Sequence, residues 1–203
     1  QPSQIYSIFA NADLPWPTIT LSDGEEVYLN QSGYSKYRAV DQREDRKAVF
    51  DAFWSKLGEY KNTMGQALLA EVEANVFQSQ MRHYDNILEW ALSGDNLPEE
   101  VYRSLVKVTN ESLPTLHRYF TLRGRMLGVE DIRYYDIYPD LVQTDEVFGI
   151  ERSIETTITG VAALGDEYGK LLKAYSKVDH THVYPQKGKR SGAYMSGSAY
   201  DTD

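Results

Sequence analysis

Residues 41–72 read DQREDRKAVFDAFWSKLGEYKNTMGQALLAEV. Their apolar side chains recur mostly at intervals of three and four residues, the spacing that gathers them on one face of an α-helix. These positions are Val49, Phe50, Phe53, Trp54, Leu57, Tyr60, Met64, Ala67, Leu68 and Val72. Asp41 and Glu44 have the spacing of a helix-capping box, although Asp stands where Ser or Thr is usual. The pattern predicts one long helix that packs in a bundle.

Further helices are expected over residues 84–92, 98–108, 113–127 and 147–177. Pro98 suits a first helical turn, and Gly128 suits the position just after a helix end. Gly165 marks a possible break inside the last helix. Residues 132–140, IRYYDIYPD, are expected to be a connector, because Pro and Asp disfavour a helix interior. The expected fold class is therefore mainly α, a helical bundle.

The first forty residues have a different pattern. Residues 5–10 suit the last turns of a helix, which the two prolines within residues 14–17 prevent from continuing. Residues 18–21 and 26–29 flank a turn that contains Gly24. Because glycine readily takes a positive φ, this segment predicts a small β-hairpin.

The 203 residues carry a formal net charge of −9 and include no cysteine. Disulfides and thiolate metal sites are thereby excluded, and the cytoplasm is the expected location. Acidic and basic residues are interspersed without a basic face, which argues against nucleic acid as a partner. No run of eighteen apolar residues occurs, so no membrane is expected either. The chain opens without Met or a signal-peptide pattern, and both ends are expected to be internal to a longer protein.

Four histidines are the candidate metal ligands: His83, His117, His180 and His182. None belongs to a His-Glu-x-x-His helix, which would place two imidazoles on one face with a general base between them. His180 and His182 would project to opposite sides of a strand and could share a metal only in a loop. We therefore expect no catalytic residue and no metal site in this chain.

Residues 188–197 read GKRSGAYMSG. Gly188-Lys189 matches part of a phosphate-binding loop, but Val183 and Arg190 stand where that motif requires Gly and Ser or Thr. A strand of small residues at a sheet edge would instead let an extended peptide pair with its backbone. The candidate substrate-binding residues are Gly192, Ala193, Tyr194, Met195 and Ser196. The alternative is an ordinary turn and strand that happen to contain glycine.

Several segments, in sequence order, resemble oligoendopeptidase F, within the zinc metallopeptidase family that includes thimet oligopeptidase. They are Arg43-Glu44-Asp45-Arg46-Lys47, Tyr60-Lys61-Asn62-Thr63, Arg82-His83-Tyr84, residues 96–102, Leu127-Gly128, Tyr135-Asp136-Ile137-Tyr138-Pro139, Leu164-Gly165-Asp166-Glu167-Tyr168 and residues 188–197. The last segment is the most specific. The resemblance covers nearly the whole chain, and only the part of the family that precedes its zinc motif.

The resemblance implies a zinc-dependent endopeptidase that hydrolyses internal bonds of short peptides within a deep helical cleft. Its zinc ligands and catalytic Glu, on a His-Glu-x-x-His helix and later segments, would lie beyond Asp203. This chain would be a truncated piece, inactive and metal-free by itself, and its partner would be the remainder of the catalytic domain. It would supply one cleft wall and a short C-terminal edge strand that aligns the substrate. Residues 1–40 would end an N-terminal region, and residues 41–203 would begin the catalytic domain.

At Val178 and at residues 180–182 the chain departs from the family pattern, which has an aromatic residue and then Ile-Asp-Val. The polar role of that Asp therefore has no counterpart in this sequence. The alternative function is a non-catalytic helical module that binds peptides or acts as a scaffold. A mainly α chain without a complete catalytic site also permits this function.

Overall fold

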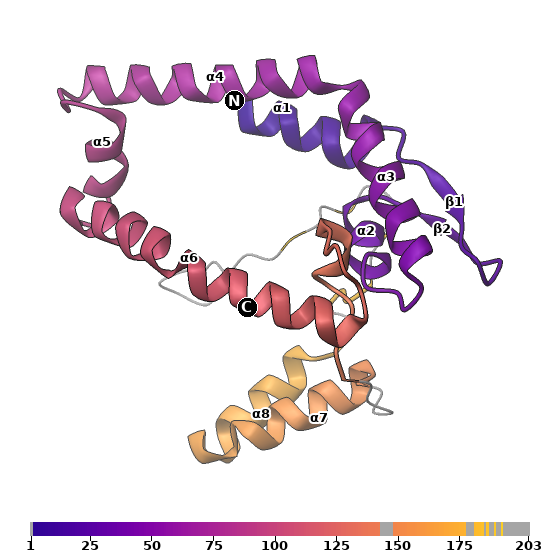
Figure 1. Cartoon of the computed structure of the whole chain (residues 1–203). Coiled ribbons are helices and arrows are strands. Elements are labelled where there is room, and N and C mark those ends of the chain that lie inside the picture. The colour runs from indigo at the N-terminus through magenta and orange to yellow at the C-terminus, as the bar shows by residue number, and fades with distance from the viewer. Residues whose placement is uncertain are drawn as a thin grey trace. The chain divides into compact units, whose positions relative to one another are not determined.

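The computed structural model describes residues 2–142, 148–177, 181–184, 186, 189 and 192. The helices, in chain order, are α1 (Pro2–Ile8), α2 (Gln31–Tyr37), α3 (Arg43–Glu59), α4 (Lys61–Met81), α5 (Ile87–Ser93), α6 (Glu99–Leu127), α7 (Ile150–Gly160) and α8 (Asp166–Tyr175) (Figure 1). A π-helical turn, η1 (Phe9–Asp13), follows α1, and two 3-10 turns are η2 (Tyr134–Asp136) and η3 (Ala162–Leu164). The prediction of a mainly α fold is confirmed.

The chain divides into two compact units. The first contains α1 to α6 with a small sheet, and the second contains α7, η3 and α8. In the second unit, Gly165 separates η3 from α8 with a φ of 96°, so the helix break predicted at this glycine is confirmed.

The small sheet of the first unit is the predicted hairpin. Strands β1 (Thr18–Thr20) and β2 (Glu26–Tyr28) pair antiparallel, with Ile19 opposite Val27. Gly24 takes a φ of 90° in the turn, which an L side chain rarely adopts. The prediction from the glycine-containing turn is therefore confirmed.

The buried core of the first unit joins the hairpin to α2 and α3. The Phe53 ring is stacked between Trp16, at a centroid distance of 4.9 Å, and Tyr34, at 4.1 Å. The other members of this cluster are Leu14, Leu21, Val27, Leu29 and Val49. Burying these side chains fixes the N-terminal half of α3 against the hairpin and α2, because apolar surface is removed from water on all three elements.

The start of α3 differs from the prediction. The helix begins at Arg43 with Gln42 as its N-cap, and no side chain caps it. The carbonyl of Asp41 instead accepts a hydrogen bond from Arg46 Nη1 at 2.7 Å. The capping box proposed for Asp41 and Glu44 is therefore wrong, because the N-cap position falls on Gln42, one residue later than that box requires.

The single long helix predicted across residues 41–72 is also wrong. α3 ends at Glu59 and α4 begins at Lys61, with Tyr60 between them at φ −106° and ψ 16°. The Tyr60 ring packs edge-on against Phe9 at a centroid distance of 5.2 Å. In Figure 1, α1 lies alongside the start of α4. Packing against the N-terminal helix therefore interrupts a pattern that is helical on both sides.

The two helices predicted at residues 98–108 and 113–127 form one helix, α6, with Pro114 in its interior. Proline removes the N–H that would bond to the carbonyl four residues earlier, but the helix continues because helical spacing of apolar residues persists on both sides. Gly128 ends α6 with a φ of 69°, as predicted. Residues 132–140 form the predicted connector, which holds the single turn η2.

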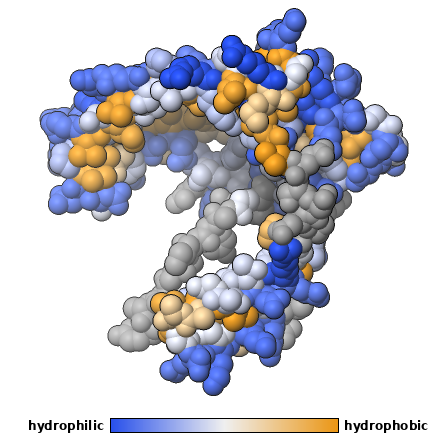
Figure 2. Space-filling model, turned by 60° about the horizontal axis from the view of Figure 1, so that its bottom comes forward, coloured by the Kyte–Doolittle hydropathy of each residue, from blue (hydrophilic) through white to orange (hydrophobic). Residues whose placement is uncertain are grey.

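One face of α6 exposes large apolar side chains over most of its length. They recur at helical spacing: Val101, Leu105, Val108, Leu116, Tyr119, Leu122 and Met126. Figure 2 shows apolar patches on the drawn surface, separated by hydrophilic residues. An amphipathic helix normally buries such a stripe, so this face of α6 has the pattern of a surface that packs against other protein.

Candidate functional site

Of the five candidate substrate-binding residues, the structure describes only Gly192. Gly192 is exposed and has a φ of 104°. Ala193, Tyr194, Met195 and Ser196 lie outside the described residues. The predicted edge strand therefore stays a prediction.

The structure does bring together two other segments on which the family resemblance was based. The start of α3 supplies Arg43 and Arg46, and η2 supplies Asp136, whose side chain is 0% exposed. Asp136 Oδ1 accepts from Arg43 Nε at 3.0 Å and from Arg46 Nη2 at 3.2 Å. Asp136 Oδ2 accepts from Arg43 Nη2 at 2.9 Å and from the Arg133 amide at 2.9 Å. Four donors therefore converge on one buried carboxylate.

The side chain of a third arginine, Arg123 of α6, binds backbone carbonyls of the same connector. Arg123 Nε donates to the Asp136 carbonyl at 2.9 Å, and Nη2 donates to the Pro139 carbonyl. Arg46 Nε donates to the Tyr135 carbonyl at 3.0 Å. Arg43, Arg46, Arg123 and Asp136 are called the arginine cluster below. It fastens the connector to both α3 and α6.

The arginine cluster shifts the ionisation of its carboxylate. Burial by itself raises the pKa of Asp136, because a charged group loses hydration. The hydrogen bonds from Arg43, the Arg133 amide and Arg46 outweigh burial, so the pKa of Asp136 is lowered from its ordinary value of 3.8. Asp136 is therefore a charged structural anchor at neutral pH, and it is not suited to act as a general base.

Next to the arginine cluster lies a group of aromatic side chains from α3 and the connector: Phe50, Trp54, Tyr134 and Tyr138. This group is called the aromatic platform below. The Phe50 ring lies 6.1 Å from Trp54 and 5.7 Å from Tyr134, measured between ring centroids. Tyr134 and Tyr138 are 5.9 Å apart, and their hydroxyl oxygens are hydrogen bonded at 3.1 Å. Trp54 is 44% exposed and Tyr134 is 51% exposed.

Arg38, at the end of α2, lies over this platform. Its guanidinium carbon is 3.6 Å from the centroid of the Tyr138 ring and 5.7 Å from that of Tyr34. The hydrogen bond with Tyr134 and burial raise the pKa of Tyr138, and burial raises the pKa of Tyr34. Both phenols are therefore neutral at physiological pH, and Arg38 contacts uncharged rings.

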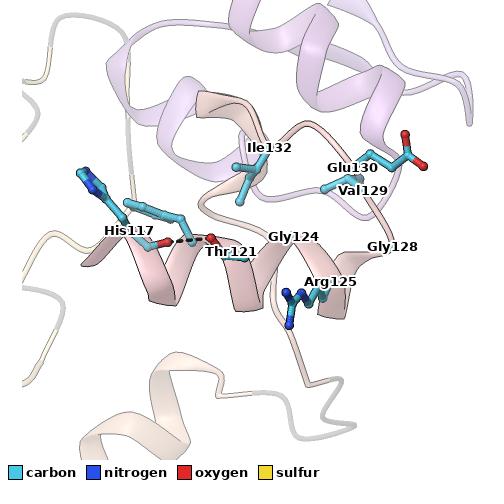
Figure 3. A pocket seen from close by; sticks show the side chains of 9 residues that line it. His117, Thr121, Gly124, Arg125, Gly128, Val129, Glu130 and Ile132 are labelled. Atoms are coloured by element: carbon cyan, nitrogen blue, oxygen red, sulfur yellow. Dashed lines mark hydrogen bonds between the residues drawn. The ribbon is translucent and has the colours of Figure 1, made fainter. Parts of the chain in front are cut away.

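A pocket of about 570 Å³ lies between the last turns of α6 and the start of the connector (Figure 3). Figure 3 shows Ile132 pointing toward α6, whereas the carboxylate of Glu130 points away from the pocket. An added Cβ on Gly124 would come within 3.2 Å of the Val129 carbonyl, so glycine permits the close approach of the two segments. His117, Arg125 and Glu130 are among its lining residues, but Figure 3 shows His117 and the Glu130 carboxylate on opposite sides, so they do not form the paired acid and base of a hydrolytic site.

The described residues do not fit a zinc site. They contain no group of three His, Cys, Asp or Glu side chains placed to hold a metal ion. Among the predicted candidates, His83 sits in a left-handed turn after α4 with a φ of 61°, and His117 is exposed on α6. His180 lies outside the described residues. No helix in the described part of the chain is both long and apolar enough to cross a membrane.

The described part of the chain is a mainly helical segment whose connector is fastened to α3 and α6 by the arginine cluster. Residues 37–202 match the model of Peptidase family M3, and the chain belongs to this family. It is similar to oligopeptidase PepF of Bacillus subtilis, with 38% identity over 99% of this chain and 30% of the relative. It is also similar to the group B oligopeptidase PepB of Streptococcus agalactiae, with 34% identity over 98% of this chain and 33% of the relative.

A solved structure agrees with these relatives. The crystal structure of oligoendopeptidase-F from Enterococcus faecium matches with a TM-score of 0.68 and 31% identity, over 86% of this chain and 33% of that one. The predicted resemblance to oligoendopeptidase F is therefore confirmed. The chain spans about a third of the length of the curated relatives that it matches.

Sequence reasoning missed the arginine cluster and the aromatic platform. Residues 43–47 and 135–139 both carry the family resemblance, but their spacing along the chain gives no sign that they touch. The one available signal was the presence of two arginines, Arg43 and Arg46, three positions apart on a predicted helix. Such a pair can meet one carboxylate, but the sequence does not say which.

Proposed function

We propose that the polypeptide containing this chain is a zinc-dependent oligoendopeptidase of the cytoplasm that hydrolyses internal bonds of short peptides. The similarity to oligopeptidase PepF across 99% of this chain carries the proposal. In this proposal a His-Glu-x-x-His segment beyond Asp203 supplies the zinc ligands and the general base. The remainder of the catalytic domain is then the partner of this chain.

In this proposal residues 1–40 end an N-terminal region, and residues 41–203 form the first part of the catalytic domain. The family match, which begins at residue 37, supports that boundary. The exposed apolar face of α6 supports a role as a wall that packs against the rest of the domain and borders the cleft. The segment 192–196 is proposed to align an extended substrate by backbone pairing.

The first test is to read the coding sequence after residue 203 for His-Glu-x-x-His and to express the whole polypeptide. Peptides of about ten residues with a quenched internal fluorophore should be cleaved, and mass spectrometry should find internal cuts. Removal of metal by a chelator should abolish cleavage, and added zinc should restore it. A folded whole polypeptide that binds such peptides without cleaving them would support the alternative of a non-catalytic binding module.

The second test addresses residues 192–196 in the whole polypeptide. Ala193→Pro removes a backbone donor and should lower cleavage about tenfold to a thousandfold, whereas Ala193→Ser keeps the backbone and should be far milder. Both variants must retain the wild-type zinc content and melting temperature. Equal cleavage by folded Ala193→Pro and wild type would refute the aligning role.

A further inference from the structure

Arg38 differs from the arginines of the arginine cluster in what it contacts. Arg43, Arg46 and Arg123 all donate to carboxylate or carbonyl oxygens. Within the described residues, the Arg38 guanidinium makes no ion pair and donates no side-chain hydrogen bond, and its contacts are with the rings of Tyr138 and Tyr34. The Tyr138 ring thus covers one face of the Arg38 guanidinium. No described residue accepts a hydrogen bond from the N–H groups at the edge of this guanidinium.

The N–H groups at the edge of the Arg38 guanidinium determine which ligand it can bind. A planar guanidinium presents parallel N–H donors that match the two oxygens of a carboxylate. A ring stacked on one face holds the group in place and reduces its competing hydration. Arg38 therefore has the charge and the donor pattern that a carboxylate ligand requires.

The rings of the aromatic platform neighbour one another, starting from the Tyr138 ring that Arg38 contacts. Tyr138 under Arg38 leads to Tyr134, and Tyr134 leads to Phe50, with centroid distances of 5.9 Å and 5.7 Å. The rings are held by packing and hydrogen bonds although Trp54 and Tyr134 are about half exposed. Exposed aromatic rings that are already fixed bind apolar groups with little loss of conformational entropy.

We propose that Arg38 and the aromatic platform together bind the C-terminal residue of a short peptide, a proposal that rests on the proposed function. Arg38 takes the free carboxylate, and the exposed Tyr134 ring, supported by the partly buried Phe50, takes a bulky apolar side chain. A terminal residue fits because its carboxylate and its side chain leave the same Cα, so that one residue reaches both neighbouring features. An internal Asp or Glu uses its own side chain for the carboxylate, so the apolar group would have to come from another residue.

The test uses the whole polypeptide and two peptides of the same sequence ending in Phe, one with a free C-terminal carboxylate and one amidated. Wild type should show a KM about tenfold lower for the free acid, because a charged hydrogen-bonded contact is lost with the amide. Arg38→Gln should remove this preference by raising the KM for the free acid about tenfold, while Arg38→Lys should keep part of it. Arg82→Gln, which removes a charge from an exposed position after α4, is the matched control and should keep the full preference.

A second pair of free-acid peptides, ending in Phe and in Gly, tests the rings. Tyr134→Ser should reduce the preference for the Phe peptide severalfold, while the acid-to-amide ratio of the Gly peptide, measured against its own amidated form, should not change. Calorimetry of the same peptides measures binding without cleavage. It therefore separates the proposed peptidase function from the proposed carboxylate site at Arg38. If no peptide is cleaved but Arg38 still governs the acid-to-amide binding ratio, the proposed function fails and this inference stands. If Arg38→Gln leaves both the cleavage and the binding ratios unchanged, or weakens both peptides equally, this inference is wrong.

Discussion

Arg43 and Asp136 lie 93 residues apart in the sequence and form a two-point ion pair, with Nε to Oδ1 at 3.0 Å and Nη2 to Oδ2 at 2.9 Å. Parallel hydrogen bonds of this kind fix orientation as well as distance. The pair therefore sets how the connector lies on α3, and with it the position of the aromatic platform.

Replacing the buried carboxylate should destabilise the chain strongly. Asp136→Asn keeps the shape but removes the charge that faces Arg43 and Arg46, so the free energy of unfolding should fall by about 3 kcal/mol. Urea unfolding of both proteins measures the difference. Asp140→Asn, at an exposed position four residues later, should change stability by less than about 0.5 kcal/mol. Similar small losses for both variants would contradict the anchoring role of Asp136.

The stability difference between wild type and Asp136→Asn should depend on pH. Because the folded state lowers the pKa of Asp136 from 3.8, the folded chain binds fewer protons than the unfolded chain in this range. The stability that the Asp136 carboxylate contributes is fully present above its pKa in the unfolded chain. It is lost as the pH falls through its lower pKa in the folded chain. The difference in unfolding free energy between the two proteins should therefore be constant from pH 7 to about pH 5 and shrink below about pH 4. A difference that stays constant down to about pH 2 would refute the assigned pKa direction.

Gly33 in the first turn of α2 should not tolerate a side chain. An added Cβ would lie 2.0 Å from the Tyr28 carbonyl oxygen, so Gly33→Ala must displace either α2 or β2. We expect a loss of about 2 kcal/mol in unfolding free energy. Gly65→Ala is the matched control, because nothing lies within 4 Å of its added Cβ in α4. This change should stabilise by about 0.5–1 kcal/mol, because alanine favours a helix. Equal effects of both changes would show that the close contact of Gly33 is not maintained.

The exposed stripe of α6 should matter only in the whole polypeptide. Leu116 is 45% exposed, so Leu116→Asp should change the stability of the 203-residue chain by no more than about 0.5 kcal/mol. If the rest of the domain covers this face, the same change in the whole polypeptide buries a charge and should lower the melting temperature by several degrees. Arg118→Asp, on the hydrophilic side of α6, should have little effect in either protein. A small effect of Leu116→Asp in both would mean that the stripe stays exposed.

The features predicted correctly from the sequence are those decided by local chemistry. Gly24, Gly128 and Gly165 all take positive φ values at the turn, helix end and helix break where they were expected. Conformational freedom is a property of the residue itself, so its neighbours in space are not needed to predict it.

The features that were missed depend on contacts between distant segments. Tyr60 interrupts a helical pattern because it packs on Phe9, which lies far earlier in the sequence. The spacing of Arg43 and Arg46 suits a shared carboxylate, but nothing near them in the sequence points to Asp136, which lies 93 residues after Arg43.

The ion pair between Arg43 and Asp136 has a topological consequence. It joins the start of α3 to η2. The chain between them, α4, α5 and α6, therefore leaves the core after α3 and returns to it at η2. A backbone cut within the exposed residues 94–97, between α5 and α6, would leave two pieces whose guanidinium and carboxylate groups can still find each other. A chain nicked there is therefore expected to keep its two pieces associated, because Arg43 and Arg46 on one piece bind Asp136 and the Tyr135 carbonyl on the other.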